Sequence, residues 1–199
     1  MKPIKKIKLS TVESFFEIEL KKNFISIGAD TATYHTAFAI IRTTDSYLIL
    51  EAFEKILVPK LAKKEKIERI LNNVDLFTEQ LDDLKNKWSQ KYKFDKAVIE
   101  DCFYSFSIQT MKLLSYNGIL TYDRLKRISN NSTIINATSV RAKIKFKKSK
   151  KKLTRPKLKE EIINYINAGL NIDLLPTEND KADAVVLALA GLIKEKRND

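Results

Sequence analysis

The order of hydrophobic patterns between residues 24 and 100 is the feature that most constrains how this chain can fold. The segment FISIGAD is rich in strand-forming residues, and TAFAIIRTTDSYLILEAFEKILV adds two more strand-like segments with a break near residues 43–46. Apolar residues then recur at three- and four-residue spacing from Ile67 to Trp88, which is typical of one long amphipathic helix with Trp88 in the core. The short apolar run of FDKAVIE is typical of a buried parallel strand. We therefore expect three consecutive antiparallel strands, a helix and a parallel strand.

The second half of the chain continues the alternation. The elements expected there are a helix at 107–127, a strand at 132–140, and helices at 158–168 and 180–194. The helix at 158–168 is expected to follow Thr154 and Pro156 and to end at Gly169. The order βββαβαβαα predicts an α/β protein with a mixed sheet flanked by helices, in one domain at 23–195. Residues 1–22 form an extension that is an arm, an added strand or a tail.

Basic residues are concentrated in one segment. Lysine and arginine outnumber aspartate and glutamate by 37 to 25, and RAKIKFKKSKKKLTRPKLK, at residues 141–159, holds eleven basic residues and no acidic one. Such a run favours binding to nucleic acid, although a solvated lysine-rich face explains the composition about as well. Binding to a membrane surface is disfavoured, because the run carries only isolated apolar residues.

The scarcity of cysteine and histidine excludes several kinds of site. Cys102 is the only cysteine and His35 the only histidine, so neither an internal disulfide nor a Cys/His zinc cluster can form. We interpret both as packing or surface residues. No apolar run approaches the roughly 18 residues that span a bilayer. The N-terminus also lacks the pattern of a secretory signal, so we expect a soluble intracellular protein.

Four carboxylates fall where secondary structure ends or begins. Asp30 and Glu100 each end an apolar strand, while Asp180 and Asp183 open an apolar helix. Each alone has an ordinary explanation, as a turn residue, a solvated side chain or a helix cap. The i,i+3 spacing nevertheless places Asp180 and Asp183 on one face of the first helical turn, where they can share a cation. Because all four are hard oxygen donors, they favour Mg²⁺ or Mn²⁺ over zinc.

The same segments, in the same order, resemble the motifs of RuvC-type Holliday junction resolvases of the RNase H-like superfamily. SIGADTATYHTAFAII resembles the first strand and the start of the second, VIEDCFYSFSIQTMKLLSYNGIL the second motif and its helix, and DKADAVVLALAGL the terminal helix. NATSVRAKI and KLKEEIINYI resemble the basic segment before the penultimate helix. The resemblance covers approximately residues 23–193 and departs from the family at Thr31, Ala32, Ala37 and the additional acid Asp101.

The resemblance implies an RNase H-like fold and a metal site that cuts DNA. The residues that take the catalytic and metal-binding positions are Asp30, Glu100, Asp180 and Asp183. Two Mg²⁺ or Mn²⁺ ions are expected there, one to activate water and one to stabilise the leaving 3′ oxygen, which leaves 5′-phosphate and 3′-hydroxyl ends. Phe103 is expected to stack on a base at the branch point. The basic residues expected to contact DNA are Arg141, Lys143, Lys147, Lys148, Lys150, Lys151, Lys152 and Lys159.

The resemblance also implies a substrate and an assembly. A four-way junction is cut symmetrically on two strands, so we expect a C2 homodimer joined through the helix after Phe103. Met111, Leu114 and Tyr122 are candidate interface residues, and burial in the chain's own core explains them equally well. Two other functions stay open: a monomeric RNase H-like nuclease acting on flaps, other branched DNA or RNA-containing substrates, and a catalytically silent protein that binds nucleic acid. No organic cofactor is expected.

Overall fold

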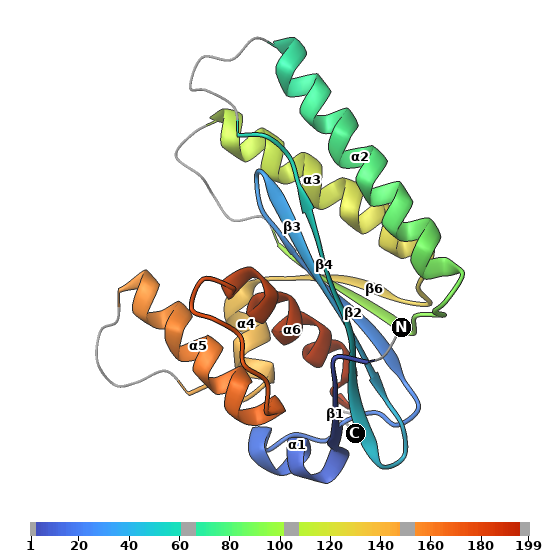
Figure 1. Cartoon of the computed structure of the whole chain (residues 1–199), viewed down its shortest axis with the longest axis vertical. Helices are drawn as coiled ribbons and strands as arrows, with labels where there is room; N and C mark the ends of the chain where they lie inside the picture. Colours follow the sequence, from blue (N-terminus) through green and yellow to red (C-terminus); the bar gives the residue numbers. More distant parts are fainter. Residues whose placement is uncertain (1–2, 61–66, 102–107, 148–153, 196–199) are drawn as a thin grey trace.

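One mixed β-sheet forms the centre of the structure, a computed structural model that describes residues 3–60, 67–101, 108–147 and 154–195 (Figure 1). Its six strands lie in the order β1-β4-β3-β2-β5-β6. They are β1 (Lys5–Lys8), β2 (Ile25–Thr31), β3 (His35–Thr43), β4 (Tyr47–Leu57), β5 (Lys96–Glu100) and β6 (Ser132–Ile135). β3 pairs antiparallel with β2 and β4, whereas β5 pairs parallel with β2 and β6. The predicted antiparallel strands, the parallel strand and the mixed α/β sheet are confirmed.

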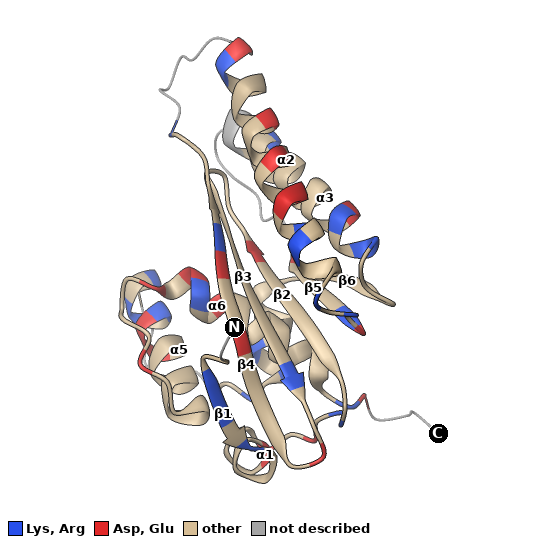
Figure 2. Ribbon diagram, turned by 45° about the vertical axis from the view of Figure 1, so that its right-hand side comes forward, with Lys and Arg blue, Asp and Glu red and all other residues tan. Residues whose placement is uncertain are grey.

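Helices cover both faces of this sheet. They are α1 (Leu9–Phe16), α2 (Ile67–Ser89), α3 (Ile108–Lys126), α4 (Ala137–Lys143), α5 (Arg155–Leu170) and α6 (Asn179–Leu192). α2 and α3 lie side by side on one face, called here the α2 face, and reach beyond the strand ends (Figures 1 and 2). α4, α5 and α6 cover the other, called the α6 face, with α1 next to α5. Within the described ranges, none of these helices is long and apolar enough to cross a bilayer.

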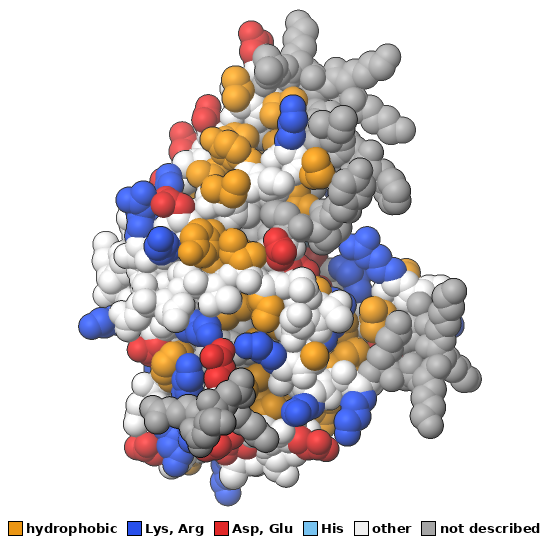
Figure 3. All heavy atoms as spheres, turned by 180° about the vertical axis from the view of Figure 1, so that it is seen from behind, with side chains coloured by type: hydrophobic (Ala, Val, Ile, Leu, Met, Phe, Trp, Pro, Cys, Tyr) orange, Lys and Arg blue, Asp and Glu red, His pale blue; other side chains and the backbone are white. Residues whose placement is uncertain are grey.

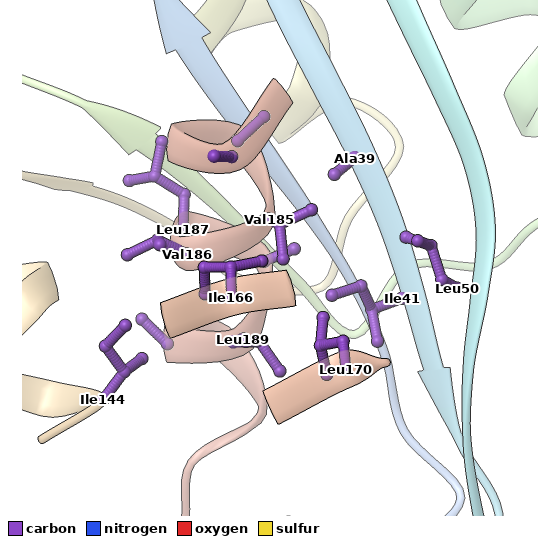
Figure 4. Close-up of a cluster of buried hydrophobic side chains, with 14 of the residues drawn as sticks. Ala39, Ile41, Leu50, Ile144, Ile166, Leu170, Val185, Val186, Leu187 and Leu189 are labelled. Atoms are coloured by element: carbon purple, nitrogen blue, oxygen red, sulfur yellow. The ribbon is translucent and has the colours of Figure 1, made fainter. Parts of the chain in front are cut away.

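Alternation along the strands divides the core between the two faces. In β2, Ile27 and Ala29 belong to the apolar cluster of the α2 face, while Gly28 lies against α6. The cluster of the α6 face includes Ile41 of β3 and Leu189 of α6 (Figure 4). Because successive side chains of a strand point to opposite faces, this pattern also fixes which way the residues at the strand ends point.

The long helix predicted from apolar spacing is α2, and its tryptophan lies in the core as expected. Trp88 is 1 % exposed. Its ring meets that of Phe38 edge-on, with 5.0 Å between the ring centroids. The contact joins the C-terminal part of α2 to the middle of β3, so the helix is anchored on the sheet at this end.

The strand expected at 132–140 is wrong in its second half. β6 ends at Ile135, and the side chain of Asn136 accepts a hydrogen bond from the backbone N–H of Ser139 at 2.8 Å. An asparagine in this position caps a helix, which explains why α4 begins immediately after the strand. Residues 137–140, expected in the strand, therefore belong to α4, which also contains Arg141.

The predicted end of α5 is also wrong, and the first residues of the chain explain why. The helix continues through Gly169 to Leu170 and ends at Asn171, which has a left-handed backbone with φ 48°. Gly169 instead makes room for the ring of Phe16 on α1, because a Cβ at this position would overlap it. Phe16 also meets Tyr165 of α5 edge-on, with 5.2 Å between the ring centroids. α1 thus braces α5.

Residues 3–22 are integrated into the fold. β1 pairs antiparallel with β4 at the edge of the sheet, so of the three possibilities left open, an added strand is observed at Lys5–Lys8. Further along, Leu20 bridges to Ile193, just after α6. The extension therefore contacts both the sheet and the end of the last helix.

Candidate active site

The ends of β2 and β5 bring two acidic side chains together. The two strands run parallel with Ala29 beside Ile99, so Asp30 and Glu100 occupy the next position of each strand. Asp30 is two residues after Gly28, which lies against α6, so its side chain points to the same face of the sheet. Asp30 is only 7 % exposed. The strand ends therefore place two carboxyl groups on the α6 face.

The first turns of α6 bring two more acids to the same place. A Cβ at residue 28 would overlap the carbonyl oxygen of Ala184, so Gly28 is what allows α6 to lie so close to β2. The helix begins at Asn179, and Asp180 and Asp183 therefore lie in its N-terminal turns. Their arrangement follows from the apolar face that buries the rest of α6 in the sheet.

A cleft of about 610 Å³ opens where these elements meet. All four predicted carboxylates line it: Asp30, Glu100, Asp180 and Asp183. Asp101, whose participation the sequence left open, also lines the cleft and is exposed. The structure thus brings the predicted acids together from two strands and one helix.

Burial and crowding act on the two most enclosed carboxyl groups. Burial raises the pKa of Asp30 well above its ordinary value, and the neighbouring Glu100 raises it further through hydrogen bonding and charge. Burial also raises the pKa of Asp183, against the opposing effect of the Arg141 guanidinium. The Arg141 Nη2 lies 3.4 Å from Asp183 Oδ1. Negative charge in this cleft is therefore only partly balanced by the chain itself.

The Asp180 carboxylate differs, because both of its oxygens already have partners. His35 Nε2 lies 3.1 Å and Lys55 Nζ 2.8 Å from Oδ2, while Asn179 Nδ2 donates to Oδ1 at 2.6 Å. The hydrogen bonds from His35 and Lys55 hold the pKa of Asp180 well below its usual range. Sequence reasoning missed both partners: it interpreted His35 as a packing or surface residue and gave Lys55 no role.

Basic residues also line the cleft. Arg141 and Lys159, both expected to contact DNA, line it together with Arg155. Two other predicted residues lie apart from the cleft lining: Lys143 pairs with Glu195 at 3.4 Å, and the exposed Lys147 lies 3.9 Å from Glu17. The predicted DNA contacts Phe103, Lys148, Lys150, Lys151 and Lys152, together with Cys102, lie outside the described residues.

The donor set has the chemistry that a hard divalent cation requires. Four carboxylates from two strands and one helix line one cleft. Burial, and then the neighbouring acids, raise the pKa of Asp30. As the side chains stand, however, no three acidic, histidine or cysteine residues in the described part of the chain form a group that could hold an ion. Asp180 and Asp183 are paired with cationic side chains instead. The residue types suit a divalent cation, but the ion pairs of Asp180 and Asp183 would have to break before these carboxylates could bind one.

No model of a known protein family matches this sequence, and no curated protein does. Solved structures do match. Thermus thermophilus RuvC in complex with a Holliday junction substrate is similar with a TM-score of 0.59 at 11 % identity, over 84 % of this chain and 92 % of that chain. Another T. thermophilus RuvC structure gives a TM-score of 0.58 at 12 % identity over the same shares. The yeast mitochondrial Holliday junction resolvase Ydc2 gives 0.51 at 12 % identity, over 90 % and 82 %.

These similarities concern the fold, because identities this low say nothing about individual site residues. They extend over most of both chains, so the likeness includes the sheet and its helical layers. The fold that the sequence motifs implied is therefore confirmed: this chain has the RNase H-like fold in the form found in RuvC-type Holliday junction resolvases.

Proposed function

We propose that this protein is a metal-dependent endonuclease that resolves four-way DNA junctions by paired hydrolysis of phosphodiester bonds. The observation that carries the proposal is the convergence of four carboxylates in one cleft that basic side chains also line. A carboxyl group as buried as Asp30 destabilises a fold unless it is paired or ligates a cation, so such a cluster points to a functional role. The likeness to RuvC solved with a Holliday junction substrate supports the choice of substrate.

The basic side chains of the cleft would hold the DNA backbone in this mechanism. Arg141, Arg155 and Lys159 line the same cleft as the four acids, and Arg155 is the first residue of α5. Guanidinium and ammonium groups in this position pair with phosphates, which positions a strand without reading its sequence. α1 packs against α5, the helix that carries Arg155 and Lys159.

The chain would hold divalent cations through its four carboxylates. These are Asp30, Glu100, Asp180 and Asp183. Mg²⁺ or Mn²⁺ bound there would supply activation of water and stabilisation of the charge on the leaving oxygen. The contribution of the protein is placement: Asp30 and Glu100 are fixed by paired strands, and Asp183 by a helix that Gly28 allows close to the sheet.

Symmetrical cutting requires two sites, and we propose that α3 supplies the dimer surface. Tyr116 and Ile119 of α3 are 50 % and 66 % exposed, and Leu71 of α2 is 55 % exposed. Tyr116 and Leu71 line a shallow apolar groove between the two helices. Hydrophobic side chains also gather toward the α2–α3 end of the molecule in Figure 3. An apolar surface of this kind on a soluble chain favours association.

The three interface candidates taken from the sequence lie differently in the structure. Leu114 is 3 % exposed, and Tyr122 packs against the apolar cluster of the α2 face, so the core explanation accounts for both. Met111 is partly exposed. The apolar residues of α3 that are free for a partner are therefore mainly Tyr116 and Ile119.

The experiment that tests this function compares cleavage of a synthetic four-way junction, a flap, an RNA-containing duplex and a linear DNA duplex, with Mg²⁺ or Mn²⁺. We expect preferential cutting of the junction, with 5′-phosphate ends. Asp30→Asn should lower the rate by roughly 10²-fold or more, because it removes a carboxylate that would hold the metal ions. Asp82→Asn is the matched control: Asp82 is ion-paired with Arg124 on the α2 face, away from the cleft.

Each alternative function predicts a different outcome. Unchanged cutting by Asp30→Asn would refute the assignment of the active site. Equal cutting of junction and flap, or preference for the RNA-containing duplex, would support nuclease activity but refute specificity for four-way junctions. Salt-dependent junction binding with no cutting under any metal would identify a silent binding protein.

A further inference from the structure

Strand β4 contains an irregularity that decides which of its side chains reach the cleft. In its pairing with β3, Ile41 lies opposite Leu50 and Ile40 opposite Ala52, so Glu51 has no partner. One extra residue on one strand of an antiparallel pair is a β-bulge. Glu51 is 7 % exposed, and its carboxylate accepts hydrogen bonds from Arg42 at 2.8 and 3.0 Å. The bulge is therefore pinned by an ion pair to the neighbouring strand.

The bulge reverses the alternation of side chains along the rest of β4. Before it, Leu48 and Leu50 pack in the cluster of the α6 face. After it, Ala52 and Ile56 belong to the cluster of the α2 face, and Phe53 packs on the α6 face. Had Glu51 been an ordinary residue of the ladder, the even-numbered positions would have stayed on the α6 face throughout. Odd-numbered residues after the bulge, Phe53 and then Lys55, therefore point to the α6 face.

Lys55 is aimed at the acidic cleft as a result. Its Nζ lies 2.8 Å from Asp180 Oδ2, which is a closer approach than the 3.4 Å between Arg141 and Asp183. Its neighbour Glu54 points to the opposite face, where it pairs with Lys87 of α2 at 2.6 Å. Adjacent residues of one strand thus make ion pairs on the two faces of the sheet.

The Lys55 pair stands where a cation would have to bind. Together with His35 on Oδ2 and Asn179 on Oδ1, it leaves neither oxygen of Asp180 without a donor from the chain. The side chains of Asp180 and Lys55 are 17 % and 36 % exposed, so water screens this pair only in part. Divalent-cation binding at this carboxylate requires that these contacts be broken.

We infer that Lys55 is an internal counter-ion of the metal site: it neutralises Asp180 and lowers the affinity of the DNA-free protein for divalent cations. The inference rests on the proposed metal-dependent function and adds a residue that regulates it. Lys55 is a positioning residue, since it acts through Asp180. A phosphate of incoming DNA would take Lys55 away from Asp180, because an ammonium group released from a carboxylate pairs readily with a phosphate.

The test measures Mn²⁺ binding to the DNA-free full chain by calorimetry and by the electron paramagnetic resonance signal of the free ion. We compare wild type, Lys55→Met and the matched control Lys87→Met. The control also removes one lysine charge, together with the ion pair that Lys87 makes with Glu54 of β4 on the other face of the sheet. Lys55→Met should bind Mn²⁺ roughly five-fold more tightly, as expected for loss of one competing, partly exposed ion pair. Lys87→Met should bind as wild type does. Lys55→Gln serves as a second variant, and thermal unfolding checks that each is folded.

The possible outcomes separate this inference from the proposed function. Binding by Lys55→Met that equals or falls below that of wild type would overturn the inference while leaving the metal site standing. An equal gain in Lys55→Met and Lys87→Met would also overturn it, because net charge alone would then explain the effect. If no variant binds Mn²⁺, or Asp30→Asn binds it as well as wild type does, the proposed function fails together with the inference.

Discussion

The two faces of the sheet are built differently, although each is covered by helices. On the α6 face, every residue of α6 from Ala184 to Leu192 is buried, and the helix lies so close to β2 that only glycine fits at residue 28. On the α2 face, α2 and α3 bury one side and leave apolar residues such as Leu71 and Ile119 exposed. The α6 face is closed within the chain, and the α2 face is not.

The difference would separate the proposed chemistry from the proposed dimer assembly. A carboxylate cluster works only if its members keep their positions, and the tight packing of α6 holds Asp180 and Asp183 against the strand ends. A surface that binds a second copy needs exposed apolar area and freedom from the catalytic groups. Three variants test this division, in order of their expected effect on folding stability.

The largest effect is expected where α6 meets β2. In Gly28→Ala, the new Cβ would overlap backbone atoms of Ala184 and Ala188, which have no rotamer by which to move away. We expect a loss of about 3 kcal/mol in the free energy of unfolding, because a well-packed core has to separate to admit the methyl group. Urea denaturation measures it. Gly169→Ala is the comparison, since there the Cβ meets side-chain rings, those of Phe15 and Phe16, rather than backbone atoms.

An unchanged unfolding midpoint in Gly28→Ala would show that α6 does not depend on this close approach. That result would remove the packing basis for the contrast between the two faces. A loss equal to that of Gly169→Ala would mean that the contact of α6 with β2 is no tighter than that of α1 with α5 on the same face.

A medium effect is expected where the two faces are linked. Asn117 of α3 is 2 % exposed, and its Nδ2 donates to the carbonyl oxygens of Ala32 and Thr33 at 3.1 Å each. These carbonyls form the turn between β2 and β3, next to Asp30. Asn117→Ala should cost about 1 to 2 kcal/mol of stability by removing two hydrogen bonds made by a buried side chain, and it should also slow junction cleavage because the turn loosens.

The control for this variant is another buried asparagine on the same face. Asn73 of α2 is 8 % exposed and donates to the carbonyl oxygen of Pro59 at 2.7 Å, away from the cleft. Asn73→Ala should lose similar stability in urea and keep its cleavage rate. If both variants lose activity in proportion to stability, Asn117 has only a structural role.

The sequence predicted the acids well because they lie at the ends of elements that its hydrophobic pattern defines. Asp30 and Glu100 end apolar runs, and the i,i+3 spacing of Asp180 and Asp183 fixes their common helical face. Helix α2 and the burial of Trp88 followed from periodicity in the same way. Where local pattern and tertiary position agree, sequence reasoning reached both the fold and the candidate site.

The residues that sequence reasoning missed depend on features with no local pattern. Lys55 reaches the cleft only because the bulge at Glu51 reverses the alternation of β4, and a pairing irregularity is invisible in one strand alone. The cap at Asn136 converts a strand-like segment into α4, since one side-chain hydrogen bond outweighs weak strand propensity. Gly169 was expected to end a helix, and its actual role depends on Phe16, far away in the sequence.

The smallest effect on folding, with a clear effect on assembly, is expected on the open surface of the α2 face. Ile119 is 66 % exposed on α3, so Ile119→Asp should change the free energy of unfolding of the monomer by no more than about 0.5 kcal/mol. If α3 forms the dimer surface, the buried aspartate should raise the dimer dissociation constant by roughly 30-fold or more. Light scattering coupled to size-exclusion chromatography, over a range of concentrations, measures this.

Leu175 provides the matched control, because it is similarly exposed, at 61 %, in the segment that precedes α6. Leu175→Asp adds the same charge to an exposed apolar position and should leave the oligomeric state unchanged. Dissociation by both variants would point to general charge repulsion, and dissociation by Leu175→Asp alone would move the interface to the side of the catalytic cleft. Only loss of the dimer in Ile119→Asp, with junction binding by each monomer retained, fits a molecule whose two faces divide assembly from chemistry.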